Sequence, residues 1–275
     1  MKTLKNKKVL ITGGAKGIGK QIAIEFSKMG ADIIICDLDK SFFSEDNFKK
    51  NVKDIKDIGG SCWGYYLDVT KYDDIIKVRE KMLSDIGKID ILVNNAGVVF
   101  GGKFLEVPIK NHQLTYAVNT QGIINMCHVS LQDLIDQPNS HIVNIASASG
   151  FTALPNGATY ASSKAAVTSF SESLLNELKK NGNTHVGMTI TCTAYVKTGM
   201  FEGVKDPILI PMLTPEKLAK KIVRAVHLNK MFVLEPAFIK CIPIIKAIFP
   251  RFIYDYLGRM LGGYNSMDFW EGHSK

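Results

Sequence analysis

Short apolar runs alternate with longer segments of helical period along most of the chain. Runs with the length and turn boundaries of strands lie at 8–12, 32–37, 62–68, 89–95, 141–147, 185–192 and 231–235. Segments long enough to be helices lie between them, at 17–29, 40–57, 71–86, 110–136, 159–180 and 215–229. This alternation predicts an α/β fold with a doubly wound parallel sheet of about seven strands. Several of the strands are apolar at almost every position, which is typical of a sheet covered by helices on both faces.

The pattern becomes irregular after about residue 195, where six of the nine prolines lie. A chain of 275 residues is within the size range of a single open α/β sheet. We therefore predict one domain over 1–275, in which 195–275 is an irregular extension.

Residues 236–261 are rich in isoleucine and phenylalanine. Three cations, Lys240, Lys246 and Arg251, interrupt this segment, and prolines 243 and 250 would break a long helix, so it is not read as a membrane span. Three uses remain open for it: a lid over an apolar pocket, an oligomer contact, or an amphipathic segment lying among lipid headgroups.

The composition is that of a folded protein, with 46% hydrophobic residues and a formal net charge of +8. No nucleic-acid-binding motif accompanies the charge, so a nucleic-acid partner is not predicted, and the charge suits an anionic cofactor or lipid surface. The five cysteines and six histidines have no ligand-like spacing, which predicts neither a metal site nor disulfides. The apolar run after the basic start is too short for a signal peptide, so we expect a cytoplasmic location, with peripheral membrane association left open.

A glycine-rich loop, TGGAKGIG at 12–19, follows the first strand and leads into the first helix. Such a loop allows a tight turn, close approach of a pyrophosphate and close helix packing, while the helix amino terminus offers free N–H donors to the anion. The context of strand before and helix after makes this a specific signal for a dinucleotide. The residues that we expect to contact the cofactor here are Thr12, Gly13, Lys16, Gly17, Ile18 and Gly19.

The second strand ends at Asp37, eighteen residues after Gly19. A carboxylate at this point can accept hydrogen bonds from the adenosine ribose hydroxyls and would repel a ribose phosphate. This favours NAD over NADP, although Lys16 in the loop pulls in the opposite direction. Asp39 is expected to cap a helix or to be solvated.

Tyr160 and Lys164 lie one turn apart on the helix predicted at 159–180, so the ammonium can lie near the phenol. The reference pKa of tyrosine is about 10, and a nearby cation would lower the cost of ionising it. The phenol could then act as a general acid or base on a substrate oxygen. Ser147 ends the fifth strand, at the edge of the sheet where ligands bind, and could donate to the same oxygen.

Six motifs together resemble the classical short-chain dehydrogenase/reductase family over about 7–200, in the order and approximate spacing of that family. They are TGGAKGIG (12–19), LDVT (67–70), NNAG (94–97), VNTQG (118–122), IVNIAS (142–147) and YASSK (160–164). The resemblance implies a Rossmann-type fold and a catalytic tetrad. In it, Asn119 keeps a helix open for a water, Ser147 orients the carbonyl, Tyr160 transfers the proton, and Lys164 holds the nicotinamide ribose.

The same resemblance implies further cofactor contacts. Asp68 and Val69 would border the adenine, while the residues that would shape the floor beside the cofactor or flank the nicotinamide amide are Asn95, Ala96, Gly97, Val196 and Thr198. One departure from the family pattern is Thr193–Ala194, which stands where the family usually has Pro-Gly and leaves the local backbone path open.

A looser resemblance, at 193–204 and 254–270, connects the chain with the branch that contains retinol and hydroxysteroid dehydrogenases. It implies a hydrophobic alcohol or carbonyl substrate, with apolar residues near 200–213 forming part of a pocket wall. The predicted pocket residues are Ser147, Phe100, Leu154, Met200, Phe201 and Met212.

The sequence thus predicts an NAD(H)-dependent oxidoreductase that interconverts an alcohol and its carbonyl, with 195–275 acting as substrate loop and extension. One alternative is an NADP(H)-dependent carbonyl reductase of small polar substrates. Another is a non-catalytic cofactor-sensing or scaffolding protein, although such proteins tend to lose the tyrosine or lysine of the YASSK motif. No GxSxG elbow is present, so serine hydrolysis is not predicted. We expect a homodimer or homotetramer in which 110–136 and 159–180 could supply the contact.

Overall fold

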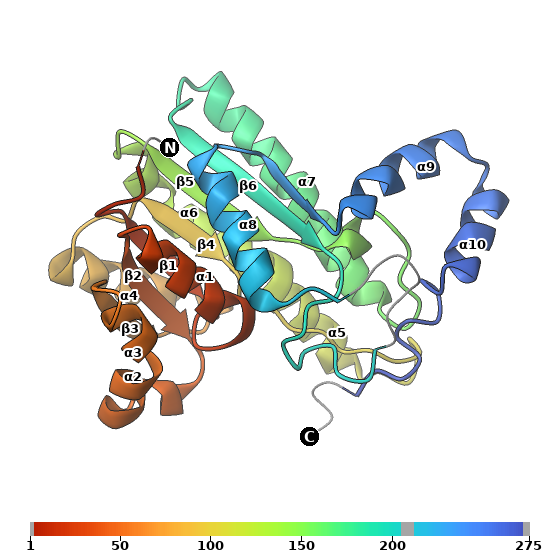
Figure 1. Ribbon diagram of the computed structural model, residues 1–275, viewed down its shortest axis with the longest axis horizontal. Coiled ribbons are helices and arrows are strands. Elements are labelled where there is room, and N and C mark those ends of the chain that lie inside the picture. Colours follow the sequence, from red (N-terminus) through yellow and green to blue (C-terminus); the bar gives the residue numbers. More distant parts are fainter. Residues whose placement is uncertain (1–2, 205–211, 272–275) are drawn as a thin grey trace.

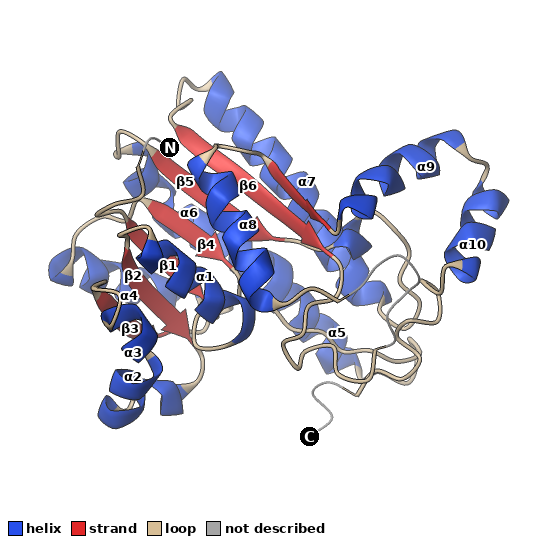
Figure 2. Cartoon of the chain, viewed as in Figure 1, coloured by secondary structure: helices blue, strands red, loops and turns tan. Residues whose placement is uncertain are grey.

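The computed structural model describes residues 3–204 and 212–271. Seven parallel strands form one sheet in the order β3-β2-β1-β4-β5-β6-β7 (Figure 2). Their bounds are β1 Lys8–Thr12, β2 Asp32–Asp37, β3 Cys62–Tyr66, β4 Ile91–Asn94, β5 Ser140–Ile145, β6 Val186–Thr193 and β7 Phe232–Glu235. The predicted fold class and all seven strand positions are confirmed. The strand order reverses between β1 and β4, and ligands bind at such a switch point in doubly wound sheets.

Helices cover both faces of the sheet (Figure 1). One face packs on α1 (Gly17–Lys28) and α8 (Pro215–His227), whose buried side chains include Phe26 and Ile222. The other face packs on α4 (Tyr72–Asp85), α6 (Gly122–Ile135) and α7 (Ala158–Lys180). Because both faces are buried, strands such as Ile91–Asn94 carry no exposed residue, which explains their continuous apolar sequence.

Two predicted helices are interrupted. The segment predicted as one helix over 40–57 forms η1 (Lys40–Phe43), α2 (Glu45–Asn51) and α3 (Lys53–Lys56). The Asp39 carboxylate accepts from the backbone N–H of Ser41 at 3.0 Å, which confirms that Asp39 is a cap, and Ser44 is extended. These local hydrogen bonds favour short turns over a continuous helix.

The segment predicted as one helix over 110–136 forms α5 (Ile109–Tyr116), a π-helical turn at Ala117–Gln121, and α6. Single π turns inside α-helices occur frequently at functional sites. The widened turn contains Asn119. Hydrogen bonds with the backbone of Val98, which follows β4, hold this side chain at the carboxyl edge of the sheet.

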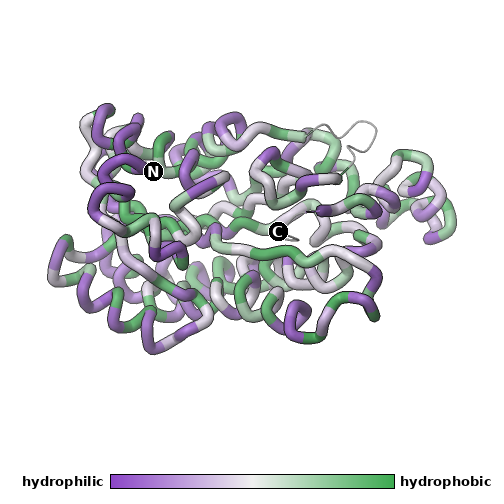
Figure 3. Tube along the Cα trace, turned by 90° about the horizontal axis from the view of Figure 1, so that it is seen from below, coloured by the Kyte–Doolittle hydropathy of each residue, from purple (hydrophilic) through white to green (hydrophobic). Residues whose placement is uncertain are grey.

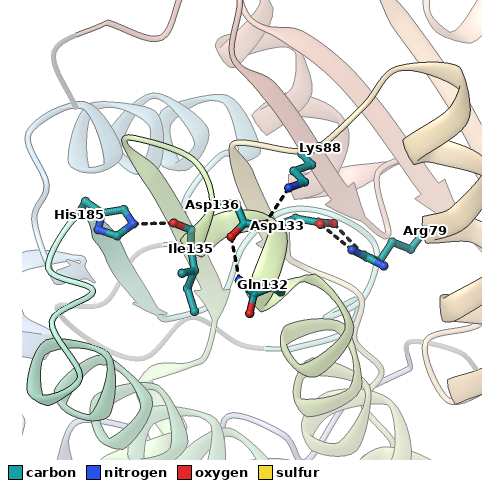
Figure 4. A network of polar contacts seen from close by, with 7 residues as sticks. All are labelled: Arg79, Lys88, Gln132, Asp133, Ile135, Asp136 and His185. Carbon is teal, nitrogen blue, oxygen red and sulfur yellow. Dashed lines mark hydrogen bonds and ion pairs between the residues drawn. The ribbon is translucent and has the colours of Figure 1, made fainter.

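At the opposite edge, a polar network holds α6 to its neighbours (Figure 4). Asp133 accepts two hydrogen bonds from Arg79 of α4, at 2.8 and 2.6 Å, and Asp136 pairs with Lys88 at 2.7 Å. The ring of His185 is hydrogen-bonded to the carbonyl of Ile135 at 2.8 Å. These contacts join elements at the amino ends of the strands and lie away from the ligand edge, so we assign them a structural role.

After β7, the chain forms η4 (Ala237–Cys241), α9 (Ile242–Ile248) and α10 (Arg251–Met260). We call α9 and α10 the C-terminal arm; it projects from the body of the molecule beyond α7 (Figure 1). Pro243 lies in the first turn of α9, and Pro250 precedes α10. Both prolines therefore divide the segment, as predicted. Within the described part of the chain, none of the helices has the length and apolar character needed to cross a bilayer.

Candidate active site

The glycine loop forms a close-fitting cradle between β1 and α1. Gly13 and Gly17 have positive φ angles of 63° and 58°, which side chains rarely adopt. A Cβ on Gly19 would lie 2.2 Å from the carbonyl oxygen of Gly13, so this position also requires glycine. The amide of Asn95 donates to the Thr12 and Gly13 carbonyls at 3.0 and 2.8 Å and fixes the loop. Backbone N–H groups at the start of α1 are thus exposed to a ligand, and the loop fits a pyrophosphate.

Asp37 lies at the end of β2 beside this loop. One of its carboxylate oxygens accepts from the Ala15 N–H at 3.0 Å, and the other accepts from the Asp39 N–H at 3.1 Å. These bonds hold the carboxylate next to the cradle, while each oxygen keeps further acceptor capacity for a ribose hydroxyl. The hydrogen bond from the Ser41 side chain is the main cause that lowers the pKa of Asp39, and the charge of the exposed Lys16 acts weakly in the same direction.

The other predicted cofactor residues line the same edge of the sheet. Asp68 accepts from the N–H and hydroxyl of Thr70, and its neighbour Val69 is buried. The N–H of Ala96 donates to the Thr12 hydroxyl at 3.1 Å. A Cβ on Gly97 would lie 3.3 Å from Asn119 Oδ1 and 3.6 Å from Lys164 Nζ, which places Gly97 between the cradle and the tetrad.

Val196 and Thr198 follow β6 and close over the cradle from the other side. Val196 is 2% exposed and bridges to Leu213, while the Thr198 side chain would lie 3.5 Å from a Cβ on Gly17. Ile18 packs on the core beneath. The structure therefore brings the residues predicted to contact the cofactor to one edge, although their contacts with it stay a prediction.

Thr193 and Ala194, which replace the family's Pro-Gly, continue the sheet. The Ala194 N–H donates to the Glu235 carbonyl at 2.8 Å, and Thr193 O accepts a long hydrogen bond from Ser147 Oγ at 3.4 Å. The backbone path that the sequence left open is therefore an extension of the β6–β7 pairing.

The four predicted catalytic residues come together from three elements. Lys164, on α7, donates from Nζ to the Ile145 carbonyl at 2.8 Å, and this nitrogen lies 5.8 Å from the centroid of the Tyr160 ring. Ser147 begins the turn after β5 and is 8% exposed. Asn119 donates to Val98 O and Ser163 Oγ at 2.9 and 3.1 Å and accepts from Val98 N–H at 2.8 Å, which anchors the π turn against α7. Its predicted role in holding a water stays a prediction.

Burial is the main influence on the pKa values of Tyr160 and Lys164. It raises the pKa of Tyr160 to about 12, against which a hydrogen bond with Ser147 acts in the lowering direction. Burial also lowers the pKa of Lys164 to about 8. Both groups are desolvated, and desolvation disfavours the charged form of each, so in the protein alone burial outweighs other influences on the Tyr160 pKa. That the Lys164 ammonium makes this phenol more acidic stays a prediction.

An apolar cavity of about 150 Å³ reaches Ser147 and Tyr160. Ala148, Leu154 and Phe201 line it near these residues. The far wall comes from η4, the C-terminal arm and the segment after it, and consists of Phe238, Ile239, Ile242, Ile245, Tyr254, Leu257, Gly258, Leu261, Gly263, Tyr264 and Ser266. The arm thus forms a wall over the pocket, which matches the lid among the three uses left open for 236–261.

The predicted pocket wall agrees with this cavity in part. Leu154 and Phe201 line the cavity, whereas Phe100, Met200 and Met212 are not among its described lining residues, and their contact with a substrate stays a prediction. Met200 and Met212 pack against a cluster of Val99, Tyr160, Val204 and Met267, which adjoins the cavity at Tyr160. Residues 205–211, part of the predicted wall at 200–213, lie outside the described residues.

Sequence reasoning missed most of the far wall. The relevant signal is the isoleucine and phenylalanine content of 236–261, for which a lid over an apolar pocket was one of three uses left open, without single residues of the wall. It also missed Tyr195, Thr152 and Ala153, which line the cavity from the loops after β6 and β5. Among the residues that the structure describes, no group of three or more histidine, cysteine, aspartate and glutamate side chains gathers as a metal site would.

A Rossmann-type sheet with a glycine cradle and a Ser–Tyr–Lys group at one edge defines a dinucleotide-dependent dehydrogenase. The short chain dehydrogenase family model matches residues 7–208, and the chain belongs to this family. It is accordingly an oxidoreductase that acts on CH–OH groups with a nicotinamide cofactor.

Its similarity to individual proteins is extensive. Mouse epidermal retinol dehydrogenase 2 is 31% identical over 257 residues, which cover 91% of this chain and 82% of that protein. Human short-chain dehydrogenase/reductase 3 is 31% identical over 277 residues, which cover 100% of this chain and 89% of that protein. Rat estradiol 17-beta-dehydrogenase 11 is 28% identical over 255 residues, which cover 92% of this chain and 83% of that protein.

Among solved structures, a short chain dehydrogenase/reductase from Burkholderia phymatum in complex with NAD superimposes with a TM-score of 0.78 at 24% identity. It covers 90% of this chain and 95% of that chain. This likeness confirms the fold.

Proposed function

We propose that the protein is an NAD(H)-dependent dehydrogenase of hydrophobic alcohols and their carbonyls, of retinoid, steroid or related lipid character. The observation that carries this proposal is the apolar cavity that ends at Ser147 and Tyr160. The retinol and estradiol dehydrogenases named among the relatives support a substrate of this kind.

The chain's own residues would act on the substrate oxygen. Tyr160 would carry the proton to or from this oxygen, and Ser147 would donate a hydrogen bond to it. Lys164, held by the Ile145 carbonyl, would contact the nicotinamide ribose. When bound, the nicotinamide supplies the hydride acceptor or donor and, when oxidised, a positive charge near the phenol.

Asp37 supports NAD as the cofactor, because its carboxylate is fixed beside the cradle and would repel a ribose phosphate. Cellular NAD is mostly oxidised, so oxidation of the alcohol is the proposed direction. The test is Asp37→Asn, which removes the charge while the side-chain oxygen can still accept from Ala15. We expect the preference for NAD over NADP to fall by about tenfold as one like charge is removed. Asp39→Ala is the matched control. An unchanged preference in Asp37→Asn would contradict the role of Asp37 in cofactor choice, and a higher kcat/KM with NADP in the unmodified chain would support the NADP-dependent alternative.

The substrate is tested by following cofactor reduction over a panel of retinoids, steroids, fatty alcohols and short polar alcohols. We expect turnover with the apolar members, because the cavity wall offers few polar partners. Activity confined to the short polar alcohols would contradict the proposal.

Assembly and location belong to the same proposal. A homodimer or homotetramer is supported by exposed apolar side chains on α5, where Ile109 is 69% exposed and Tyr116 is 42% exposed. We also propose a cytoplasmic location, and a lipid-like substrate would favour peripheral contact with a membrane. Size-exclusion chromatography with light scattering measures the assembly.

A further inference from the structure

The outer face of α10 carries an apolar stripe. Phe252, Tyr256 and Met260 are 74%, 66% and 55% exposed. They are spaced four residues apart, so they lie on one side of the helix. The opposite side of α10 carries Tyr254 and Leu257, which line the cavity. The helix therefore presents apolar side chains in two directions.

The same division holds in α9. Ile242 and Ile245 line the cavity, whereas Ile244 and Ile248 are 59% and 69% exposed. Phe249, at the corner between the two helices, is 42% exposed. Both helices of the arm thus have exposed apolar side chains besides those that line the cavity, and the arm carries both apolar and polar segments where it projects from the body (Figure 3).

Basic side chains outnumber acidic ones in η4 and the arm, although Lys246 Nζ turns back to donate to the Phe151 carbonyl at 3.3 Å. Residues 237–260 contain four basic side chains and one acidic one, so the segment has a net charge of +3 (4 − 1). The acidic residue, Asp255, is paired with Arg251 at 2.8 Å. The other basic residues, all exposed, are Lys240, Lys246 and Arg259.

The net positive charge favours one of two possible partners for this outer face, which are a second copy of the chain and a lipid surface. A second copy of the arm packed on this face would bring the same cations together, which is unfavourable. An anionic lipid surface offers the opposite charge, and its acyl boundary can receive apolar side chains from a projecting helix pair. Apolar residues flanked by exposed cations are typical of segments that lie in the plane of a bilayer interface.

We propose that the outer face of the C-terminal arm docks on an anionic bilayer, with Ile244, Ile248, Phe249, Phe252, Tyr256 and Met260 inserted at headgroup depth. The inner face of the arm then receives the substrate from the lipid. This second step rests on the proposed function, whereas the docking itself does not.

The test uses the full chain and sedimentation with phosphatidylcholine vesicles, with and without phosphatidylserine. We expect binding to the phosphatidylserine vesicles that weakens as salt is raised. Phe252→Ser combined with Met260→Ser should lower the partition coefficient at least tenfold, since each substitution removes a large apolar side chain that would be buried at the bilayer. Lys240→Gln combined with Lys246→Gln should lower binding to the anionic vesicles and leave binding to phosphatidylcholine unchanged.

A matched control is Met29→Ser combined with Ile58→Ser, at exposed apolar positions on the side of the body away from the arm, 47% and 42% exposed. It should bind vesicles as the unmodified chain does. An equal loss of vesicle binding in the control variant, or no vesicle binding by the unmodified chain, would overturn the proposal. Loss of self-association in the Phe252/Met260 variant, with no change in vesicle binding, would assign the face to a second copy and also overturn it.

The vesicle measurement contains no turnover, so it separates the two proposals. Vesicle binding without activity on any apolar alcohol would contradict the proposed function and leave the docking face supported. Activity on apolar alcohols without vesicle binding would support the proposed function and contradict the docking face.

Discussion

The nucleotide edge of the sheet and the C-terminal arm build their sites in different ways. At the nucleotide edge, backbone geometry decides which residues fit: a Cβ on Gly19 would meet the Gly13 carbonyl oxygen at 2.2 Å. In the arm, two short helices place apolar side chains on opposite sides, toward the cavity and toward the surroundings. The first region tolerates few residue types and therefore has recognisable motifs. The second needs only apolar character and leaves no fixed motif.

The largest effect should come from the tetrad. Tyr160→Phe removes the hydroxyl that would exchange a proton with the substrate, and we expect kcat to fall by about 10²–10⁴-fold. The dissociation constant of NAD, measured by fluorescence quenching, should change little. Tyr195→Phe is the control, because Tyr195 lines the same cavity and its hydroxyl is hydrogen-bonded to Ser266 at 2.7 Å. Full activity in Tyr160→Phe would contradict the acid/base role of this hydroxyl, whereas no turnover in the unmodified chain would support a scaffold or cofactor sensor.

The contrast between the regions also explains what the sequence could predict. The seven strands follow from continuous apolar runs, and the tetrad follows from motifs with fixed spacing. The breaks in the helix predicted at 40–57 depend on local hydrogen bonds such as that from the Ser41 N–H to the Asp39 carboxylate. Helix propensity alone does not predict such bonds. The raised pKa of Tyr160 depends on burial by residues distant in the chain. The far pocket wall was missed because α9 has only seven residues, too few for a periodicity to distinguish inner from outer side chains.

A second prediction concerns the buried part of the sheet. Burial lowers the pKa of His141, in β5, to about 3, and its ring is hydrogen-bonded to Thr189 at 2.8 Å. The unfolded chain therefore binds more protons than the folded one between pH 6.5, the ordinary value, and about 3. The free energy of unfolding should decrease as pH falls through this window, by up to about 1.4 kcal/mol per pH unit from this residue.

The measurement is urea unfolding from pH 7 to pH 4, with His141→Gln for comparison. Glutamine has no proton to gain in this range and can still hydrogen-bond to Thr189, so the variant should lose less stability than the unmodified chain on acidification. Parallel pH profiles would show that His141 does not carry the effect.

The third prediction compares the two sides of α9 directly. Ile245→Ala shortens a side chain that lines the cavity, and we expect KM for an apolar alcohol to rise about tenfold, with the affinity for NAD unchanged. Ile248→Ala makes the same change on the outer side, where the residue is 69% exposed. Its KM for alcohol in vesicle-free buffer should be unaffected. Equal effects of the two substitutions would mean that the inner and outer faces are not separate.

The smallest expected effect concerns how the arm is held. The hydroxyls of Thr152, after β5, and Tyr254, on α10, are hydrogen-bonded to each other across the cavity wall. Thr152→Val removes one partner, and a typical net contribution of about 1 kcal/mol predicts roughly fivefold faster hydrogen exchange of the α10 amides. Tyr254→Phe should have a similar effect, and the double variant should add little, because both substitutions break the same bond. Exchange that stays slow in all three variants would mean that apolar packing, rather than this hydroxyl pair, holds the arm over the pocket.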